Sequence, residues 1–308
     1  MDKVNVLYCF DSTCWQMAAV SIESLLLTAN ATTHIAIYCM VTPGTKGYRK
    51  IKRITKSHKS AVDLIWREVK PEENPFQGPE YSKWNPALFH RCFAHRLFKD
   101  VDKILYLNTV TLVFHDLSEL FNTDISDYAF GAVVDMAPIM DAHNSLGVAI
   151  KEFSDKYLNG GPYYNSGVLL LNLKKMAEYD HLLFETKVPL RYPNQDLLNA
   201  AFVGKIKTLP LKYNLAPGVG VPTHFSPEDA AEINSGKHVI IDCYYAKPYD
   251  KANTNKLVYD MFEKCSKNIG MSPEKFLKAE QKRNAKETFV PHVKVLGKTI
   301  FFFGMKIN

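Results

Sequence analysis

The sequence lacks several features that would assign it to common protein classes. No stretch approaches the ~20 apolar residues that are needed to cross a bilayer. The first six residues, Met-Asp-Lys-Val-Asn-Val, lack the basic-then-apolar pattern of a signal peptide. The six cysteines are scattered without a C-x-x-C pair, so neither a zinc site nor a disulfide framework is indicated. Apolar neighbours around Cys9, Cys39 and Cys92 predict reduced, buried thiols, which are typical of a reducing cytoplasm.

Acidic residues are missing from one part of the chain. Residues 46–59 contain seven basic and no acidic residues, and residues 274–308 contain eight basic and three acidic ones. The net charges of these two segments are +7 and +5. Since the net charge of the whole 308-residue chain is +6, the rest of the chain has a net charge of −6. An acidic remainder argues against a nucleic-acid binder, and residues 46–59 lack the interleaved aromatics that stack on bases. This basic segment is predicted to be a helix whose charged face is either solvated or directed to anionic lipid.

Strand-like apolar runs alternate with helical patterns in an order that is typical of βαβ units. The predicted fold class is therefore α/β with a mainly parallel sheet. Residues 72–86 are expected to form a loop, and residues 136–161 a long excursion of the kind that often covers a substrate. We expect strands at 4–10, 34–41, 61–66, 103–107, 112–114, 130–134, 168–173 and 239–243, and helices at 15–28, 46–59, 87–98, 116–121, 194–202 and 255–265.

Polar residues gather where the predicted strands end. Asp11 and Thr13 follow the first strand, Asn108 the fourth and Asp135 the sixth. Each residue alone is more often a turn or a cap, but their recurrence indicates a nucleotide or a ligand with many hydroxyls at the carboxyl edge of the sheet. No P-loop, G-x-G-x-x-G or G-x-S-x-G motif is present.

Several runs resemble motifs of glycosyltransferase family 8. Residues 103–113, K-I-L-Y-L-N-T-V-T-L-V, resemble the family core K-V-L-Y-L-D-x-D-x-L-V, and residues 163–173, Y-Y-N-S-G-V-L-L-L-N-L, resemble Y-F-N-S-G-V-L-L-I-N-L. Residues 194–199, 211–214 and 246–249 are similar to its D-Q-D-x-L-N, L-x-x-x-Y-N and x-K-P-W elements. The resemblance implies a GT-A, Rossmann-like domain over residues 1–273, followed by a helical, basic and aromatic tail over 274–308.

The resemblance also implies an activity and a set of site residues. The activity is that of a retaining hexosyltransferase, which moves a sugar from a UDP-sugar to a glycan or glycolipid such as lipopolysaccharide or lipooligosaccharide. The departing UDP gains negative charge, which Arg91 and Lys247 are suited to stabilise. Lys247 as a solvated surface residue and Asn165 as a turn cap remain the alternatives. The implied catalytic residues are Gln195 and Asn194, and the implied donor-binding residues are Asp11, Thr13, Arg91, Asn108, Asp135, Asn165, Ser166 and Lys247.

The sequence departs from the family at the metal ligands. The two carboxylates of the D-x-D motif are replaced by Asn108 and Val110, and the ligand His falls on Ile241 without a gap or on Asp242 with one residue deleted. A hard cation prefers charged oxygens, so a tight Mn²⁺ or Mg²⁺ site is not expected. Either Arg, Lys or His side chains neutralise the diphosphate, or the domain has lost catalysis and binds a glycan or stabilises a partner. The family aromatic over the uracil is Cys14 here, and the first Asp of D-Q-D is Asn194.

The C-terminal tail mixes lysines with aromatic residues. Residues 289–306 include Phe301, Phe302 and Phe303 together with three lysines. This composition suits attachment to an anionic membrane surface, while packing on the domain or on a partner subunit is the alternative. The expected location is cytoplasmic and peripheral, on the inner face of the membrane, with no nucleic-acid partner.

Overall fold

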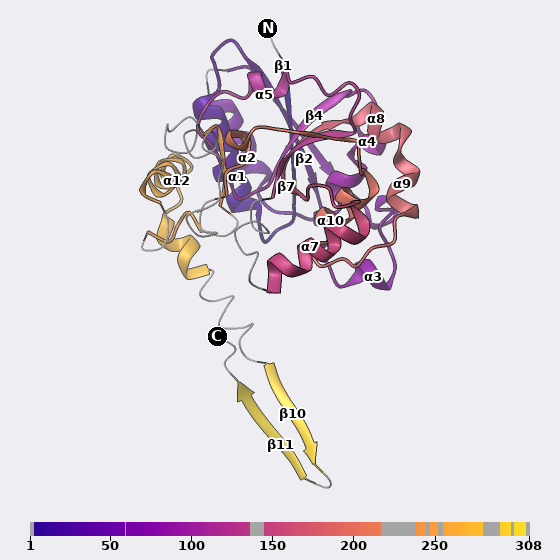
Figure 1. Ribbon diagram of the computed structural model, residues 1–308. Helices are drawn as coiled ribbons and strands as arrows, with labels where there is room; N and C mark the ends of the chain where they lie inside the picture. Colours follow the sequence, from indigo (N-terminus) through magenta and orange to yellow (C-terminus); the bar gives the residue numbers. More distant parts are fainter. Residues whose placement is uncertain are drawn as a thin grey trace.

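The computed structural model describes residues 3–58, 60–135, 145–216, 238–243, 247–251, 255–279, 290–296 and 299–305. Its centre is a seven-stranded sheet with the order β3-β2-β1-β4-β7-β6-β8, flanked by helices (Figure 1). The strands are β1 Lys3–Phe10, β2 His34–Val41, β3 Val62–Glu68, β4 Lys103–Leu107, β5 Thr111–Val113, β6 Phe130–Val134, β7 Tyr164–Asn172, β8 Ile206–Thr208 and β9 Ile240–Asp242. The helices are α1 Trp15–Thr28, α2 Tyr48–Ser57, α3 Pro79–Ser82, α4 Ala94–Leu97, α5 Ser118–Phe121, α7 Ser145–Tyr157, α8 Leu173–Glu178, α9 Asp180–Glu185, α10 Pro193–Ala201 and α12 Lys256–Asn268, with short 3-10 turns η1 Pro71–Glu73, η2 Pro86–Leu88, η3 His90–Phe93 and η4 Leu211–Tyr213.

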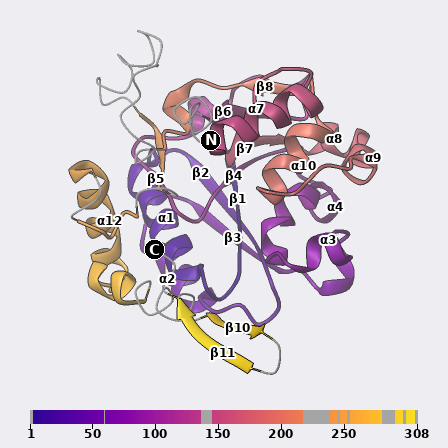
Figure 2. The same ribbon diagram turned by 60° about the horizontal axis from the view of Figure 1, so that its bottom comes forward.

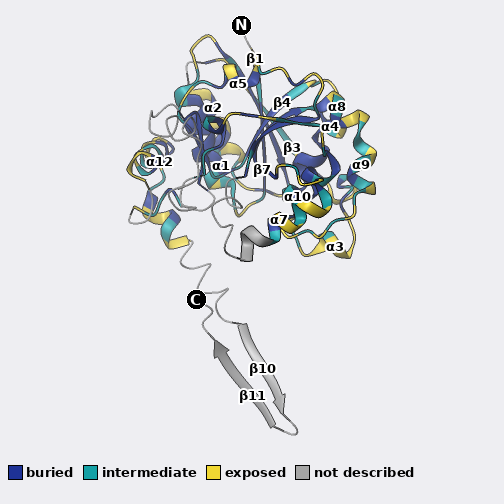
Figure 3. Ribbon diagram, in the orientation of Figure 1, coloured by how far each residue is buried: buried dark blue, intermediate teal, exposed yellow. Residues whose placement is uncertain are grey.

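The parallel half of the sheet follows from its apolar composition. β1 pairs in parallel with β2 and with β4, and β2 pairs in parallel with β3. β1 and β2 are near-continuous apolar runs that are buried along almost their whole length, as expected for strands covered on both faces. Helices α1, α2 and α12 lie on one side of the sheet, and α3, α4, α8, α9 and α10 lie on the other (Figure 2). The buried residues accordingly form two large apolar clusters, and the buried strands run through the centre of Figure 3.

Two features of the sheet position the site. β7 is antiparallel to both β4 and β6, so the start of β7 lies at the edge where β4 and β6 end. β9 does not join the large sheet but pairs with β5, which places Asp242 opposite Thr111. Both arrangements bring residues that are far apart in the sequence to one edge.

Three sequence predictions are corrected. The helix expected over 87–98 is broken into η2, η3 and α4. Its residues His90 to Phe93 are all buried, so packing on every side replaces the single apolar face of a regular helix. The excursion expected over 136–161 contains the 13-residue helix α7, and its first part, 136–144, lies outside the described residues. β7 begins at Tyr164, before the predicted strand, because pairing with β6 extends it.

The C-terminal segment has two parts in the structure. Residues 273–279 are helical, as expected for the start of the tail. Further on, β10 Val290–Leu296 and β11 Thr299–Met305 form an antiparallel hairpin, which the sequence pattern did not predict (Figure 1). None of the helices in the described part of the chain has the length and apolar character that crossing a bilayer requires. All six cysteines are free, and the predicted buried thiols Cys9, Cys39 and Cys92 are indeed buried.

Candidate functional site

The candidate site is built where β1, β4 and β6 end and β7 begins. The backbone N–H of Asn108, after β4, donates to Gly167 O at 2.8 Å. The N–H of Asp135, after β6, donates to Tyr163 O at 2.8 Å. These bonds tie the ends of two strands to the start of β7, so polar residues from three elements meet at one edge.

A buried network centres on the Asp135 carboxylate. Asp135 is 5% exposed, and its Oδ2 accepts from Gln195 Nε2 at 2.8 Å and from Asn165 Nδ2 at 3.1 Å. The other end of the Gln195 amide is also engaged, because its Oε1 accepts from the Ser166 N–H at 2.8 Å. Gln195 therefore connects the end of β6 to the start of β7 and is held in a single orientation.

Two asparagines extend this network. Asn194 Nδ2 donates to Ser166 Oγ at 2.8 Å. Asn214 Nδ2 donates to Asn165 Oδ1 at 2.9 Å, and the Oδ1 of Asn214, which is only 4% exposed, has no hydrogen-bond partner in the described part of the chain. The sequence analysis gave Asn214 no role, although the resemblance to L-x-x-x-Y-N had marked the position. A buried acceptor beside Asn165 is suited to a hydroxyl donor.

The start of α10 is fixed by Asp196, which the sequence analysis also left without a role. Its carboxylate accepts from the backbone N–H groups of Arg191 at 2.7 Å and Tyr192 at 2.6 Å, and from the Tyr163 hydroxyl at 2.5 Å. Burial raises the pKa of Asp196 despite these donors. An acidic residue in the first turn of a helix is the sequence signal for such a cap. It places Asn194 and Gln195 toward the strand ends.

Arg91 supplies a buried positive charge next to this network. It is 5% exposed, its Nη1 donates to Ser166 O at 2.8 Å, and its guanidinium lies 3.9 Å from the centroid of the Tyr106 ring. Arg91 Nε and the Tyr106 hydroxyl are both buried without a hydrogen-bond partner among the described residues. An arginine that is held on one side and keeps unused donors is suited to an anionic oxygen.

Asp11 forms a second group of hydrogen-bonded polar residues at the end of β1. Its Oδ1 accepts from Thr13 N at 2.8 Å and Thr13 Oγ1 at 2.6 Å, and its Oδ2 accepts from Asn85 Nδ2 at 2.7 Å. Partial burial raises the pKa of the Asp11 carboxyl, but the hydrogen bonds from Thr13 and Asn85 outweigh it, so the pKa lies below its ordinary value. Asn85 belongs to the segment that was expected to be a loop, and no sequence pattern distinguished it.

The three positions of the family metal ligands are neighbours in the structure. Val110 O accepts from Cys243 N at 3.1 Å, and Asp242 pairs with Thr111. The family's ligand His aligns with Ile241 or with Asp242. Ile241 lies in the apolar core. The Asp242 carboxylate lies against Gly167, so close that a Cβ built on Gly167 would be 2.1 Å from Asp242 Oδ2. The cluster thus holds one carboxylate, one amide and one hydrocarbon side chain.

This donor set does not fit a divalent cation of the family type. Mn²⁺ and Mg²⁺ favour several charged oxygens, and Asp242 is the only charged group at the three positions. Among the described residues, no group of three or more His, Cys, Asp and Glu side chains is arranged to hold a metal ion.

Lys247 is the predicted donor-binding residue that follows β9 in the chain. It is half-buried, and although burial raises the pKa of the Cys243 thiol, Lys247 is close enough to act in the opposite direction. Residues 244–246, which precede it, lie outside the described residues. The other predicted residues are connected as described above, with Asn108 held through its backbone.

Comparison with known proteins agrees with this architecture. The family model "Glycosyl transferase family 8" matches residues 5–239. The lipopolysaccharide 1,2-glucosyltransferase of Escherichia coli K12 is 27% identical over 219 residues, which are 68% of this chain and 62% of that protein. The chain therefore spans less than two thirds of that relative's length.

Solved structures show the same fold. The galactosyltransferase LgtC, in complex with donor and acceptor sugar analogues, superposes with a TM-score of 0.67 at 21% identity and covers 89% of this chain and 99% of LgtC. The bifunctional glycosyltransferase WbbM has a TM-score of 0.69 at 21% identity, covering 86% of this chain and 49% of WbbM. These likenesses confirm the predicted GT-A fold class. Because the family model matches most of the chain, this protein belongs to glycosyl transferase family 8.

Proposed function

We propose that this protein is a retaining hexosyltransferase, which moves a sugar from a UDP-sugar to a cell-surface glycan or glycolipid of the lipopolysaccharide or lipooligosaccharide kind. The observation that carries the proposal is the network of Asp135, Gln195 and Ser166 at the carboxyl edge of the sheet. It gathers an acceptor and several amide groups that suit sugar hydroxyls, and it is preorganised by burial.

The proposed roles follow the position of each residue in the site. Asp135, Asn165 and Ser166 bind the donor sugar, and Gln195 lies near the anomeric carbon with Asn194 behind it. Asp11 and Thr13, together with Asn108, hold the nucleoside end.

Positive side chains take the place of a metal in this proposal. When the sugar leaves, negative charge grows on the diphosphate, and Arg91 and Lys247 stabilise that charge. Arg91 is suited to this task because it is buried and already oriented by Ser166 O and the Tyr106 ring. Buried, fixed cations stabilise developing charge more strongly than solvated ones do. The reaction is then metal-independent, or it depends only weakly on metal.

The proposal divides the chain into a transferase domain, residues 1–273, and an attachment segment, residues 274–308. The segment contains eight basic residues and, near its end, three consecutive phenylalanines. Its attachment to anionic lipid would place the protein on the inner face of the membrane, beside a lipid-linked acceptor.

Nucleotide binding and turnover test this function. Calorimetry with UDP is expected to show binding with and without EDTA, and release of UDP from UDP-glucose or UDP-galactose is expected to persist in EDTA. Arg91→Ala should weaken UDP binding strongly, whereas Arg96→Ala, which changes a distant arginine paired with Asp180, should not. Absence of binding to UDP and to every UDP-sugar would refute the proposal.

The missing carboxylates favour a second candidate, a family 8 domain without catalysis that binds a glycan or stabilises a partner transferase. The test restores the ligands with Asn108→Asp, Val110→Asp and Asp242→His. The structure selects position 242 because Ile241 is in the core. Activity that appears only in the restored protein supports this candidate, while strong turnover by the unaltered protein excludes it.

A further inference from the structure

Helix α2 carries a set of cations that the chain itself does not neutralise. From residue 46 to residue 58, six lysines and arginines occur without any acidic residue. None of the six has an ion pair with another residue in the described part of the chain. Other exposed helices neutralise their lysines, as in the pairs Lys151–Asp155 and Lys256–Asp260. The charge on α2 is therefore free to act on something outside the chain. The six residues are Lys46, Arg49, Lys50, Lys52, Arg53 and Lys56.

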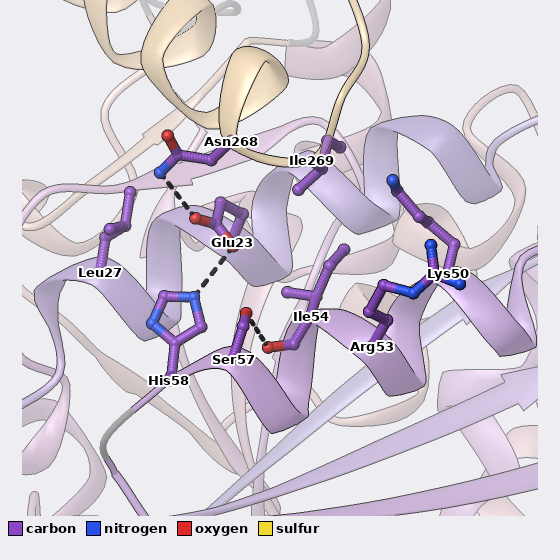
Figure 4. Close-up of a pocket in the computed structure, with 9 residues that line it drawn as sticks. All are labelled: Glu23, Leu27, Lys50, Arg53, Ile54, Ser57, His58, Asn268 and Ile269. Carbon is purple, nitrogen blue, oxygen red and sulfur yellow. Dashed lines mark hydrogen bonds and ion pairs between the residues drawn. The ribbon is translucent and has the colours of Figure 1, made fainter.

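Two of these cations line a cavity. A cavity of about 510 Å³ lies between α1, α2 and the end of α12 (Figure 4). Lys50 and Arg53 extend from α2 along one side of it, whereas the Ser57 hydroxyl donates to Ile54 O at 2.8 Å. The remaining lining is mixed: Leu27, Ile54 and Ile269 are apolar, and Glu23, His58 and Asn268 are polar. The cavity thus combines two positive charges with an apolar strip and a polar far wall.

The far wall of the cavity is held together by a buried carboxylate. Glu23 is 4% exposed and accepts from His58 Nε2 at 3.0 Å and from Asn268 Nδ2 at 2.9 Å. These bonds join α1 to the end of α2 and to the end of α12, so the cavity walls are fixed before any ligand enters. Because Glu23 already has two donors, it leaves Lys50 and Arg53 unpaired.

We infer that this cavity and the α2 face around it form a docking site for the phosphate headgroups of an anionic membrane. One lipid phosphate binds between Lys50 and Arg53, and the glycerol and first acyl carbons lie on Leu27, Ile54 and Ile269. The other α2 cations act on the surrounding surface charge. The site is separate from the C-terminal tail and does not depend on the proposed transfer reaction.

Two observations favour a lipid phosphate over a nucleic acid. The cavity lining contains no Phe, Tyr or Trp side chain on which a base could stack, and the ring of His58 is engaged by Glu23. The aromatic residue on the helix, Tyr48, is 40% exposed and packs edge-on against Trp66 at 5.4 Å between ring centroids, a position suited to the headgroup region. A basic helix with an exposed tyrosine beside a cavity that has two cations and an apolar strip matches a membrane surface.

Helix α2 begins next to the loop that holds part of the candidate site. Lys46 N donates to Ser12 Oγ at 3.1 Å, so the start of the helix is tied to the loop that holds Asp11 and Thr13. Gly47, at the N-terminal end of α2, lies so close to Trp15 that a Cβ would be 2.8 Å from its ring. Docking through α2 therefore places the candidate site close to the membrane surface.

Vesicle sedimentation of the full chain tests this site with matched variants. The probes are vesicles of pure phosphatidylcholine and vesicles with about one third phosphatidylglycerol. Lys50→Gln with Arg53→Gln removes two charges inside the cavity, and Lys52→Gln with Lys56→Gln removes two from the same helix outside it. With ~1 kcal/mol for each basic residue near an anionic surface, loss of two such charges weakens binding to the anionic vesicles roughly thirty-fold. The first pair also loses the direct contacts with the lipid phosphate, so it should weaken binding by more than this. The second pair should weaken it clearly less, and pure phosphatidylcholine should bind little of any form.

Each alternative result has a defined meaning. Equal losses for the two pairs overturn the cavity as a site and leave only diffuse attraction. No loss for either pair overturns a role of α2 and assigns vesicle binding to the tail. Saturable binding of inorganic phosphate, or of RNA in a filter assay, without vesicle binding overturns the membrane as partner. UDP binding by both pairs is expected to be unchanged, which separates failure here from failure of the proposed function.

Discussion

Gly167 is the position where one added methyl group tests the geometry of the site most directly. A Cβ built there would lie 2.1 Å from Asp242 Oδ2 and 2.9 Å from Asn165 Oδ1. Neither distance is tolerated between a carbon and an oxygen that are not bonded. In Gly167→Ala, the Asp242 carboxylate must therefore rotate, or β9 must move away from β7.

The expected cost follows from the buried position of both groups. Asp242 is 2% exposed, so its carboxylate has little free space to enter. Overpacking of this kind costs about 1–3 kcal/mol of unfolding free energy. In a domain of this size, each kcal/mol lowers Tm by roughly 2–4 °C. UDP binding should weaken as well, because the displaced carboxylate lies against the start of β7, next to Ser166.

Urea unfolding followed by tryptophan fluorescence provides the measurement, and a double-mutant cycle with Asp242→Ala isolates the contact. Removal of the carboxylate should reduce the cost of Gly167→Ala by ~1 kcal/mol or more. Gly131→Ala serves as a control in the same sheet, because its new Cβ would meet the Leu209 side chain no closer than 3.1 Å and should cost less. If Gly167→Ala costs the same with Asp or Ala at position 242, the placement of Asp242 against β7 is refuted.

Three further predictions concern the network and its buried neighbours. Gln195→Ala removes the amide between Ser166 and Asp135, so turnover of a UDP-sugar should fall at least about tenfold. The affinity for UDP, measured by calorimetry, should change little. Equal losses of turnover and of UDP affinity would contradict the assigned position of Gln195. Arg91→Lys keeps the charge but loses the fork that reaches Ser166 O, and UDP affinity should drop about tenfold in the same assay. Burial lowers the pKa of His90 to about 4, below the ordinary value of about 6.5, so the folded state binds fewer protons and stability falls as the pH drops through this window. The unfolding free energy of the protein minus that of His90→Gln should therefore decrease by up to ~3 kcal/mol between pH 7 and pH 4, and a pH-independent difference would contradict it.

The regular elements of the large sheet were predictable because their signals are local. β1, β2 and β4 are near-continuous apolar runs, and burial on both faces demands such runs. The helix α1 was predicted with its observed ends because its apolar spacing is helical. In contrast, the helix expected over 87–98 is broken, since its side chains are buried by contacts from several directions that no local pattern records.

The candidate site was predictable as a set of residues but not as a geometry. Polar residues after β1, β4 and β6 had to meet, because the parallel strands end at one edge. The contact of Asn85 with Asp11 spans 74 positions, and that of Asn214 with Asn165 spans 49. No sequence pattern marked Asn85, and the family element over 211–214 marked Asn214 without indicating its partner. Long-range pairs of this kind are set by how the loops pack on the sheet.

The sequence by itself determined the class of fold, the family and the loss of both carboxylates at 108 and 110, since each of these is a matter of which residues occur in which order. The tertiary structure decided where Ile241 and Asp242 lie, because the pairing of β9 with β5 and strand alternation place Ile241 in the core and Asp242 against Gly167. It also decided that two α2 cations line a cavity, because helices from opposite ends of the domain sequence form the walls. Register and packing between distant segments are collective properties, and they exist only once the chain has folded.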